Sequence, residues 1–288
     1  MTSGATPTEA ALPYRWTILT VATVAQTTAA IPFLGVGVLA GFLQERFDLS
    51  GTETGLLVTA IGIVPLFALI PVGRFLDHHS ERMIITAGAL LLGGGVAIAS
   101  FFNSYLALLA VLAIGGAGYS TSQPGGSKVV AAWFPGPERG VAMGIRQTGV
   151  PLGGAVAAAT LPQFASRFGV DTALLAAGCA AIAGGLTFLA LYRPAPLVVN
   201  SSYHLASELR SLLSRFQIRT AMWIGLAMVS AQFALLSYLM LYLRDVHDIP
   251  LATGAWVLFG AQISGVAGRI LLARWSDRLR SGRQVAVL

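Results

Sequence analysis

The sequence is poor in charged residues. Asp, Glu, Lys and Arg make up 10% of its 288 residues, against about a quarter in an ordinary soluble domain. Hydrophobic residues make up 55% of the chain. A soluble fold of this size needs many more charged side chains to cover its surface. The composition therefore excludes a water-soluble protein and predicts one whose solvent is mostly lipid.

Cysteine and histidine are also scarce. Cys179 is the only cysteine, which excludes a disulfide framework and a cysteine-based metal site. The four histidines fall outside the apolar stretches, and only His78 and His79 are neighbours. An enzyme or metal site in the membrane would need clustered His, Asp, Glu or Cys side chains. We therefore expect no enzymatic activity, no metal and no cofactor.

Seven uncharged stretches account for most of the chain. They run over residues 16–44, 54–73, 83–127, 147–166, 172–192, 220–243 and 249–268. The third has 45 residues, which as one helix would be about 68 Å long, roughly twice the thickness of the hydrocarbon core. Dividing it at Asn103 and Ser104 predicts eight transmembrane helices. No stretch alternates with period two, so the predicted fold is an all-α membrane bundle.

The basic residues are concentrated on one side of the predicted membrane. When the connections are assigned alternately, fifteen of the 18 Lys and Arg residues fall on the side of the N-terminus. Short cytoplasmic loops retain Lys and Arg, so we predict a multi-pass protein of the inner or plasma membrane with a cytoplasmic N-terminus. The net charge of +6 is then a signal of topology, and we expect no nucleic-acid partner.

One connection is much longer than the others. Residues 193–219 separate the sixth and seventh stretches and begin with Arg-Pro-Ala-Pro. A linker between two related halves would lie here. We therefore predict an N-terminal six-helix half over residues 1–192, a cytoplasmic linker over 193–218, and a partial C-terminal half over 219–288.

A short motif recurs after the second and eighth predicted helices. The first copy holds Gly73, Asp77 and Arg82, and Asp277 occupies the position of Asp77 in the second copy, 200 residues later. A repeat of this length implies a whole protein of about 400 residues. We therefore expect this chain to be C-terminally truncated, with residues 284–288 as the start of a ninth helix.

These features resemble the major facilitator superfamily of secondary transporters. In that family the loop after helix two reads Gly-x-x-x-Asp-(Arg)-x-Gly-(Arg)-Arg/Lys. Gly73, Asp77 and Arg82 fall on three of its positions, whereas residues 78, 80 and 81 depart from it. The stretch Trp-Phe-Pro-Gly-Pro-Glu-Arg-Gly at residues 133–140 is similar to the organic-anion branches of the family. The resemblance implies twelve helices, of which eight are present here.

The resemblance also assigns a role to the repeated loop, which acts in the family as an inner gate. The gate residues that it implies are Gly73, Asp77, Arg82, Asp277 and Arg278. A solvated loop whose arginines only set the topology is the alternative.

Polar side chains within the predicted helices are the candidate substrate contacts. A helix that starts near Arg139 would carry Arg146 about 10 Å along its axis, where an unpaired guanidinium is costly. No carboxylate is available inside the first five helices to pair with it, so an anionic solute is the expected partner and snorkelling to the headgroups is the alternative. The resemblance places helices one, four and seven around a central cavity. The full set of candidates is Gln26, Thr27, Tyr119, Gln123, Arg146, Gln147, Gln232 and Tyr238.

The predicted function is secondary active transport. The resemblance implies a permease that moves a small organic solute, with an organic anion favoured, by alternating access in its full-length form. Export of apolar compounds is the main alternative, and a channel is disfavoured because no filter motif is present. The expected partners are the solute, an ion gradient that can drive its movement, and the lipid bilayer around a monomer.

Overall fold

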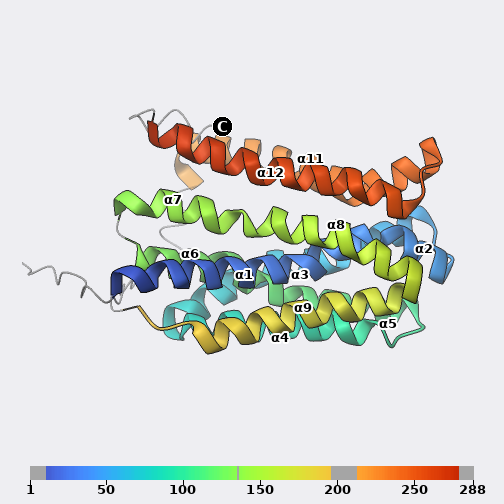
Figure 1. The fold of residues 1–288 in the computed structure, drawn as a ribbon, viewed down its shortest axis with the longest axis horizontal. Helices are drawn as coiled ribbons and strands as arrows, with labels where there is room; N and C mark the ends of the chain where they lie inside the picture. The colour runs from blue at the N-terminus through green and yellow to red at the C-terminus, as the bar shows by residue number, and fades with distance from the viewer. Residues whose placement is uncertain (1–10, 135, 196–212, 279–288) are drawn as a thin grey trace, which may run out of the picture.

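The computed structural model describes residues 11–134, 136–195 and 213–278, and within these ranges it contains helices and no strand (Figure 1). The helices are α1 (Ala11–Val38), α2 (Ala40–Phe47), α3 (Gly51–His78), α4 (Glu81–Ala99), α5 (Tyr105–Ala117), the 3₁₀ turn η1 (Gly118–Thr121), α6 (Ser122–Trp133), α7 (Gly136–Gln147), α8 (Gly149–Phe168), α9 (Val170–Leu191), α11 (Phe216–His247) and α12 (Leu251–Arg278). The all-α membrane fold predicted from the sequence is confirmed.

Seven helical segments of the described chain are long and apolar enough to cross a membrane. They are α1, α3, α4, the run from α5 through η1 to α6, α9, α11 and α12. The predicted fifth span, α8, is not among them, so the predicted count of eight is not confirmed. α8 has 20 residues and is rich in Gly, Ala and polar residues, which are less hydrophobic than Leu or Ile. It still packs against α1 and α12 and runs alongside the other spans (Figure 1).

The turn predicted within the long third stretch is confirmed. α4 ends at Ala99 and α5 begins at Tyr105, with Asn103 and Ser104 between them. The linker predicted over residues 193–218 falls mostly outside the described residues. On its far side α11 begins at Phe216, a few residues before the predicted apolar stretch.

The 200-residue repeat is visible in the structure. α3 runs from residue 51 to 78 and α12 from residue 251 to 278. Each follows a helix that is capped by an aspartate with a left-handed backbone, Asp48 at φ 51° and Asp248 at φ 53°. The N–H of Asp48 donates to the carbonyl of Gln44, and the N–H of Asp248 donates to that of Arg244. Left-handed C-caps satisfy the last carbonyls of a helix in this way, so equivalent turns join equivalent helices.

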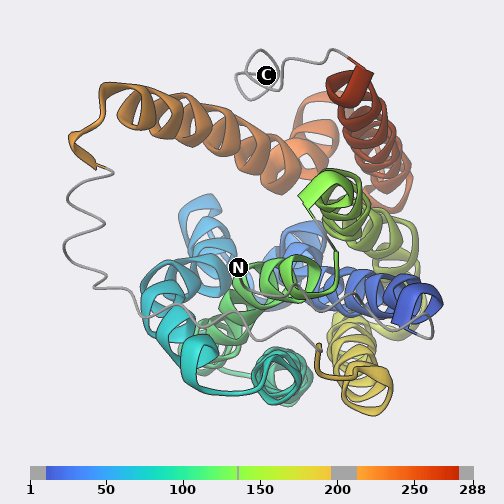
Figure 2. The same ribbon diagram turned by 90° about the vertical axis from the view of Figure 1, so that its left-hand side faces the viewer.

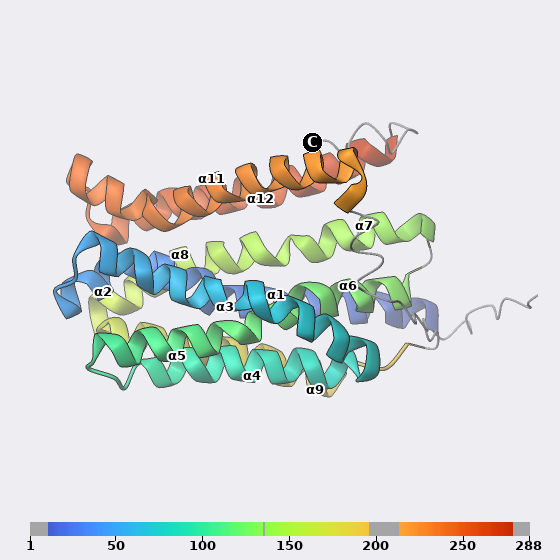
Figure 3. The same cartoon turned by 180° about the vertical axis from the view of Figure 1, so that it is seen from behind.

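The most extensive helix packing in the bundle involves α1, α4, α8 and α9. α4 packs against α9, and α1 packs against both α8 and α9. Small residues allow the close approach that helices need in a membrane. A Cβ on Gly93 of α4, for example, would lie 2.6 Å from the carbonyl oxygen of Gly178 in α9. α11 and α12 lie together along one side of this bundle, as the end-on view and the view from behind show (Figure 2 and Figure 3).

The turns gather at two opposite ends of the bundle (Figure 1). One end, called here the Asp48 end, holds the turns at residues 48–50, 100–104, 169 and 248–250. The other, called the Ser80 end, holds the turn at residues 79–80, the end of α6 and the start of α7. The distribution of basic residues in the sequence assigns the same connections to the same two sides of the membrane, so the two groupings agree. Which end faces the cytoplasm stays a prediction.

Candidate functional site

A cavity of about 470 Å³ lies between two groups of helices, α11 and α12 on one side and α1, η1, α6, α7 and α8 on the other. Its volume is in the range of small-molecule sites, roughly 300 to 1,000 Å³. The lining residues are Phe33, Leu34, Tyr119, Gln123, Gln147, Val150, Val229, Gln232, Phe233, Leu236, Gln262 and Arg269.

The polar part of the lining consists of four amides, one phenol and one guanidinium. The amides belong to Gln123, Gln147, Gln232 and Gln262. An amide both donates and accepts hydrogen bonds, so these side chains can bind the hydroxyl and carboxylate groups of a polar solute. No Asp or Glu is among the described residues that line the cavity. The wall therefore carries positive charge without an acidic group to oppose it.

Arg269 supplies this positive charge. It lies in α12, and its Nη1 donates to the backbone oxygen of Gln147 at 2.5 Å, which ties α12 to the end of α7. Arg269 is not among the predicted site residues, because an arginine directly after an apolar stretch is expected in a loop. α12 continues to Arg278, so Arg269 lies more than two turns inside the helix. The 200-residue repeat does indicate that Arg269 lies within a helix, since the residue equivalent to Arg269 in the first copy, Leu69, lies within the second predicted span.

Arg146 lies behind the cavity wall and not in it. Its side chain, in the last turn of α7, is 0% exposed. Nη1 donates to Oε1 of Gln26 at 2.5 Å and to the carbonyl of Ser122 at 3.3 Å. Nη2 donates to Oε1 of Gln123 at 2.9 Å, to the carbonyl of the same residue at 3.4 Å, and to Oγ of Ser127 at 3.3 Å. All of these acceptors are neutral, and Arg146 is not among the residues that line the cavity.

The local sequence makes room for this buried guanidinium. Gly126 of α6 has no side chain, and a Cβ there would lie 2.9 Å from Cζ of Arg146. On the other side, Gln26 of α1 is buried, and its Nε2 has no hydrogen-bond partner among the described residues. Arg146 therefore connects α1, α6 and α7 through polar contacts in the interior of the bundle.

Aromatic rings form the apolar part of the wall. Phe33 of α1 stacks on Tyr119 of η1 with their ring centroids 3.8 Å apart and an interplanar angle of 7°. Phe233 of α11 meets Phe33 edge-on at 6.4 Å. Rings of this kind bury large apolar surfaces and can contact the carbon face of a solute.

Four of the eight predicted substrate contacts line the cavity, namely Tyr119, Gln123, Gln147 and Gln232. Two others, Gln26 and Arg146, bind each other behind it. Thr27 and Tyr238 do not line it. The hydroxyl of Thr27 donates to the carbonyl of Thr23 in its own helix at 2.8 Å, and the Tyr238 side chain is 50% exposed. The other eight lining residues, among them Phe33, Gln262 and Arg269, are not in the predicted set.

The predicted gate residues lie toward the Ser80 end. Nε of Arg82 donates to the carbonyl of Leu189 at 2.6 Å, so this side chain ties α4 to α9. Gly73 and Asp77 lie in the last part of α3, and the exposed carboxylate of Asp77 has no ion pair among the described residues. The side chains of Asp277 and Arg278 lie outside the described residues.

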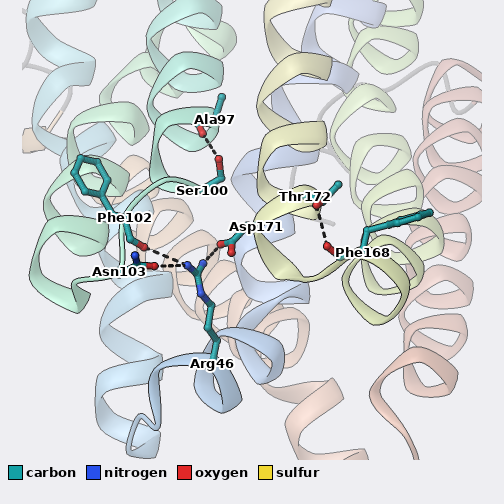
Figure 4. A network of polar contacts seen from close by, with 8 residues as sticks. All are labelled: Arg46, Ala97, Ser100, Phe102, Asn103, Phe168, Asp171 and Thr172. Atoms are coloured by element: carbon teal, nitrogen blue, oxygen red, sulfur yellow. Dashed lines mark hydrogen bonds and ion pairs between the residues drawn. The ribbon is translucent and has the colours of Figure 1, made fainter.

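Arg46 forms a polar cluster at the Asp48 end (Figure 4). It is ion-paired with Asp171 and donates to Oδ1 of Asn103 at 3.0 Å and to the carbonyl of Phe102 at 3.4 Å. Partial burial lowers the pKa of the Arg46 guanidinium. The cluster ties α2 to the α4–α5 turn and to the start of α9, all of which precede α11 in the chain.

A second cluster at the same end, called here the Arg244 cluster, joins the two groups of helices. Arg244 of α11 donates to Oε1 of Gln44 at 2.8 Å and to Oε1 of Glu45 at 3.3 Å, both in α2, and to Oδ1 of its neighbour Asp245 at 2.6 Å. The hydrogen bond with Asp245 raises the pKa of Arg244. Beside the cluster, Leu251 at the start of α12 lies over Gly41 of α2.

Known proteins resemble this chain over half or more of its length. The uncharacterized MFS-type transporter Rv2994 of Mycobacterium tuberculosis is 30% identical over 276 residues, which are 93% of this chain and 60% of that protein. The D-galactonate transporter of Escherichia coli O6:H1 is 28% identical over 151 residues, which are 51% of this chain and 35% of that protein.

A solved structure has the same fold. The bacterial homolog of the human lysosomal transporter Spinster superposes with a TM-score of 0.71 at 18% identity, over 94% of this chain and 64% of that one. The chain therefore spans less than two thirds of the length of these matched proteins. A sequence model of the Major Facilitator Superfamily matches residues 17–288. With the helical fold and the cavity between its two groups of helices, this match shows that the chain belongs to the Major Facilitator Superfamily of membrane transporters, whose members are not enzymes.

Proposed function

We propose that the protein is a secondary transporter of a small organic anion. The observation that carries the proposal is the cavity wall, where Arg269 and four amides face the interior without any carboxylate among the described lining residues. A cation in a site with little water attracts an anion more strongly than it does in bulk solvent. The donors of the wall can also bind hydroxyl groups, which favours a sugar acid over a simple alkyl acid.

Arg146 adds to the attraction for an anion. It is buried directly behind Gln123, and no described carboxylate contacts it. Because a neutral hydrogen bond does not cancel its charge, the positive potential of this arginine extends into the adjacent cavity. The D-galactonate transporter among the relatives, by its printed name, moves such an anion.

The transport cycle that fits this proposal is alternating access between two halves. We place the first half over residues 1–192 and the second from residue 219, with the gate at Gly73, Asp77, Arg82, Asp277 and Arg278. The N-terminus is then cytoplasmic in the inner or plasma membrane, and an ion gradient drives the cycle. Related halves that rock around a central site are the general design of such carriers.

Binding of D-galactonate tests the anion proposal. Titration calorimetry on the purified protein in detergent should show binding, and Arg269→Gln should weaken it at least tenfold, because a hydrogen bond from a charged group is worth about 1.5–3 kcal/mol. Arg269→Lys, which keeps the charge, should weaken it less. Arg46→Gln is the matched control, since this arginine lies at the Asp48 end, does not line the cavity, and has no described partner in α11 or α12.

The aromatic wall supports one rival function, the export of apolar compounds. Phe33, Tyr119 and Phe233 could stack on an apolar cation or a flat dye. If a hydrophobic dye such as ethidium bound and D-galactonate did not, and if Arg269→Gln strengthened the binding of the dye, the export of apolar compounds would replace the anion proposal.

A further inference from the structure

The amide of Gln123 belongs both to the cavity wall and to the buried contacts of Arg146. The side chain lines the cavity, and its Oε1 accepts a hydrogen bond from Nη2 of Arg146 at 2.9 Å. A guanidinium has five N–H donors and no acceptor. It can therefore bind only the oxygen of an amide, never the nitrogen, so the contact determines which way round the amide is held.

Gln26 shows how strongly the guanidinium imposes this orientation. Its Oε1 also accepts from Arg146, at 2.5 Å, although this leaves its buried Nε2 without a partner among the described residues. Hydrogen bonds from an ionised donor are about twice as strong as those between neutral groups. The charged donor therefore decides the orientation of the amide even where the other end of the amide stays unsatisfied.

The same constraint at Gln123 has a consequence for the cavity. With Oε1 held by Arg146, the NH₂ group is the end of the amide that remains for other partners. No described residue accepts from this Nε2, and the side chain lines the cavity. We infer that Arg146 is a positioning residue that holds the Gln123 amide with its N–H donors toward the cavity, so that this position recognises a hydrogen-bond acceptor of the solute, such as a carboxylate oxygen. The inference rests on the proposed transport of an organic anion.

Arginine suits this role better than lysine. Its two terminal nitrogens hold one amide on α1 and another on α6 at the same time. A lysine ammonium has the same charge but is a single point on a flexible chain, without the rigid fork of the guanidinium. The substitution Arg146→Lys therefore keeps the positive charge behind the wall while it releases the Gln123 amide to rotate.

A double-mutant cycle on D-galactonate affinity tests the inference. Arg146→Lys and Gln123→Met should each weaken binding about tenfold, because each removes the oriented N–H donor. The double variant should also be about tenfold weaker and not a hundredfold, since both substitutions remove the same interaction. Gln123→Met leaves Arg146 with its bonds to Gln26 and Ser127, which favours a folded protein.

Gln232 provides the matched control. It lines the same cavity from α11 and has no contact with Arg146 among the described residues. Gln232→Met combined with Arg146→Lys should multiply the two single effects. Gln123→Glu is a second variant that keeps Arg146 and its acceptor but has no N–H to offer, and it should bind at least as weakly as Gln123→Met.

The outcomes separate this inference from the proposed function. If the unsubstituted protein binds none of D-galactonate, lactate and sulfate, the proposed function fails and the inference fails with it. If it binds D-galactonate while Arg146→Lys or Gln123→Glu keeps full affinity, or while the cycle with Gln123 is multiplicative, only the positioning role is lost. If Arg146 had only a structural role, Arg146→Lys would lower the melting temperature, and the effects of Arg146→Lys and Gln123→Met on affinity would multiply.

Discussion

Two arginines near one cavity differ in what satisfies their charge. Arg269 makes one described hydrogen bond and lines the cavity, whereas Arg146 is fully buried with five. Burying a guanidinium without hydrogen-bond partners lowers the free energy of unfolding by about several kcal/mol. The depth of Arg146 follows from its place in the sequence, but the identity of its partners does not, because Gln26 and Gln123 reach it from α1 and α6.

Gly126→Ala should destabilise the protein. A Cβ at this position would lie within 3.2 Å of Cδ of Arg146 and closer still to its Cζ, and the buried side chain is too firmly held to move away. Overpacking of this kind costs about 1–3 kcal/mol, which thermal unfolding in detergent would detect. Gly62→Ala is the control, because its Cβ would meet nothing within 4 Å. Equal melting temperatures for the two variants would contradict the described packing.

At the scale of elements, glycine decides how closely two helices approach. Gly93 and Gly94 are neighbours in α4, yet a Cβ on Gly93 would press on the backbone of α9 while one on Gly94 would meet nothing within 4 Å. Both glycines are visible in the sequence. Which of them faces α9 depends on the rotation of α4 about its axis, and only the assembled bundle determines this.

The adjacent pair gives a prediction for this contact. Gly93→Ala should lower the melting temperature by an amount equivalent to about 1–3 kcal/mol. Gly94→Ala should leave it unchanged or raise it slightly, because alanine is favoured over glycine in a helix by about 1 kcal/mol. The measurement is thermal unfolding of both variants in the same detergent. A loss of stability in Gly94→Ala equal to that in Gly93→Ala would show that α4 is rotated differently.

At the scale of the whole molecule, equivalent positions of the repeat meet at the Asp48 end. Gln44 and Arg244 are 200 residues apart and are hydrogen-bonded to each other at 2.8 Å. Residues related by a two-fold axis meet in this way when they lie close to the axis. The Arg244 cluster therefore joins α2 to α11 at the place where the two copies of the repeat come together.

Loss of this cluster should loosen the Asp48 end. Spin labels on Thr52→Cys and Thr253→Cys, in a Cys179→Ala background, report the distance between the starts of α3 and α12. Arg244→Ala should lengthen and broaden this distance. The loss of unfolding free energy should stay below about 1 kcal/mol, because exposed ion pairs contribute little.

Arg46→Ala is the control for this measurement. All of its described partners precede α11 in the chain (Figure 4), so the distance between the labels should not change. A distance that Arg244→Ala left unaltered would mean that apolar contacts, such as Leu251 over Gly41, hold this end without the cluster.

Features that depend on neighbouring residues could be predicted from the sequence, and features that depend on distant contacts could not. Length, apolar content and the turn at Asn103 and Ser104 are local properties, so the helices and their order could be predicted. The helix α8 was predicted, but it is not among the seven segments apolar enough to cross a membrane, because its Gly and Ala residues make it only weakly apolar. Half of the predicted substrate contacts line the cavity. Arg269 could not be predicted from the local sequence, because a charged residue after an apolar stretch is typical of the end of a transmembrane helix.

The sequence by itself determined that this protein is a helical membrane protein with a 200-residue repeat, because hydrophobicity, charge and spacing are carried by neighbouring residues. Its loop motifs also resemble those of the Major Facilitator Superfamily. Only the tertiary structure decided which polar side chains face the cavity. That choice depends on how α1, α6, α7, α11 and α12 are rotated and placed against one another, and it assigned Arg269 to the wall and Arg146 to the interior behind it. Contacts between residues more than a hundred positions apart, such as Arg146 with Gln26, have no local signal in the sequence.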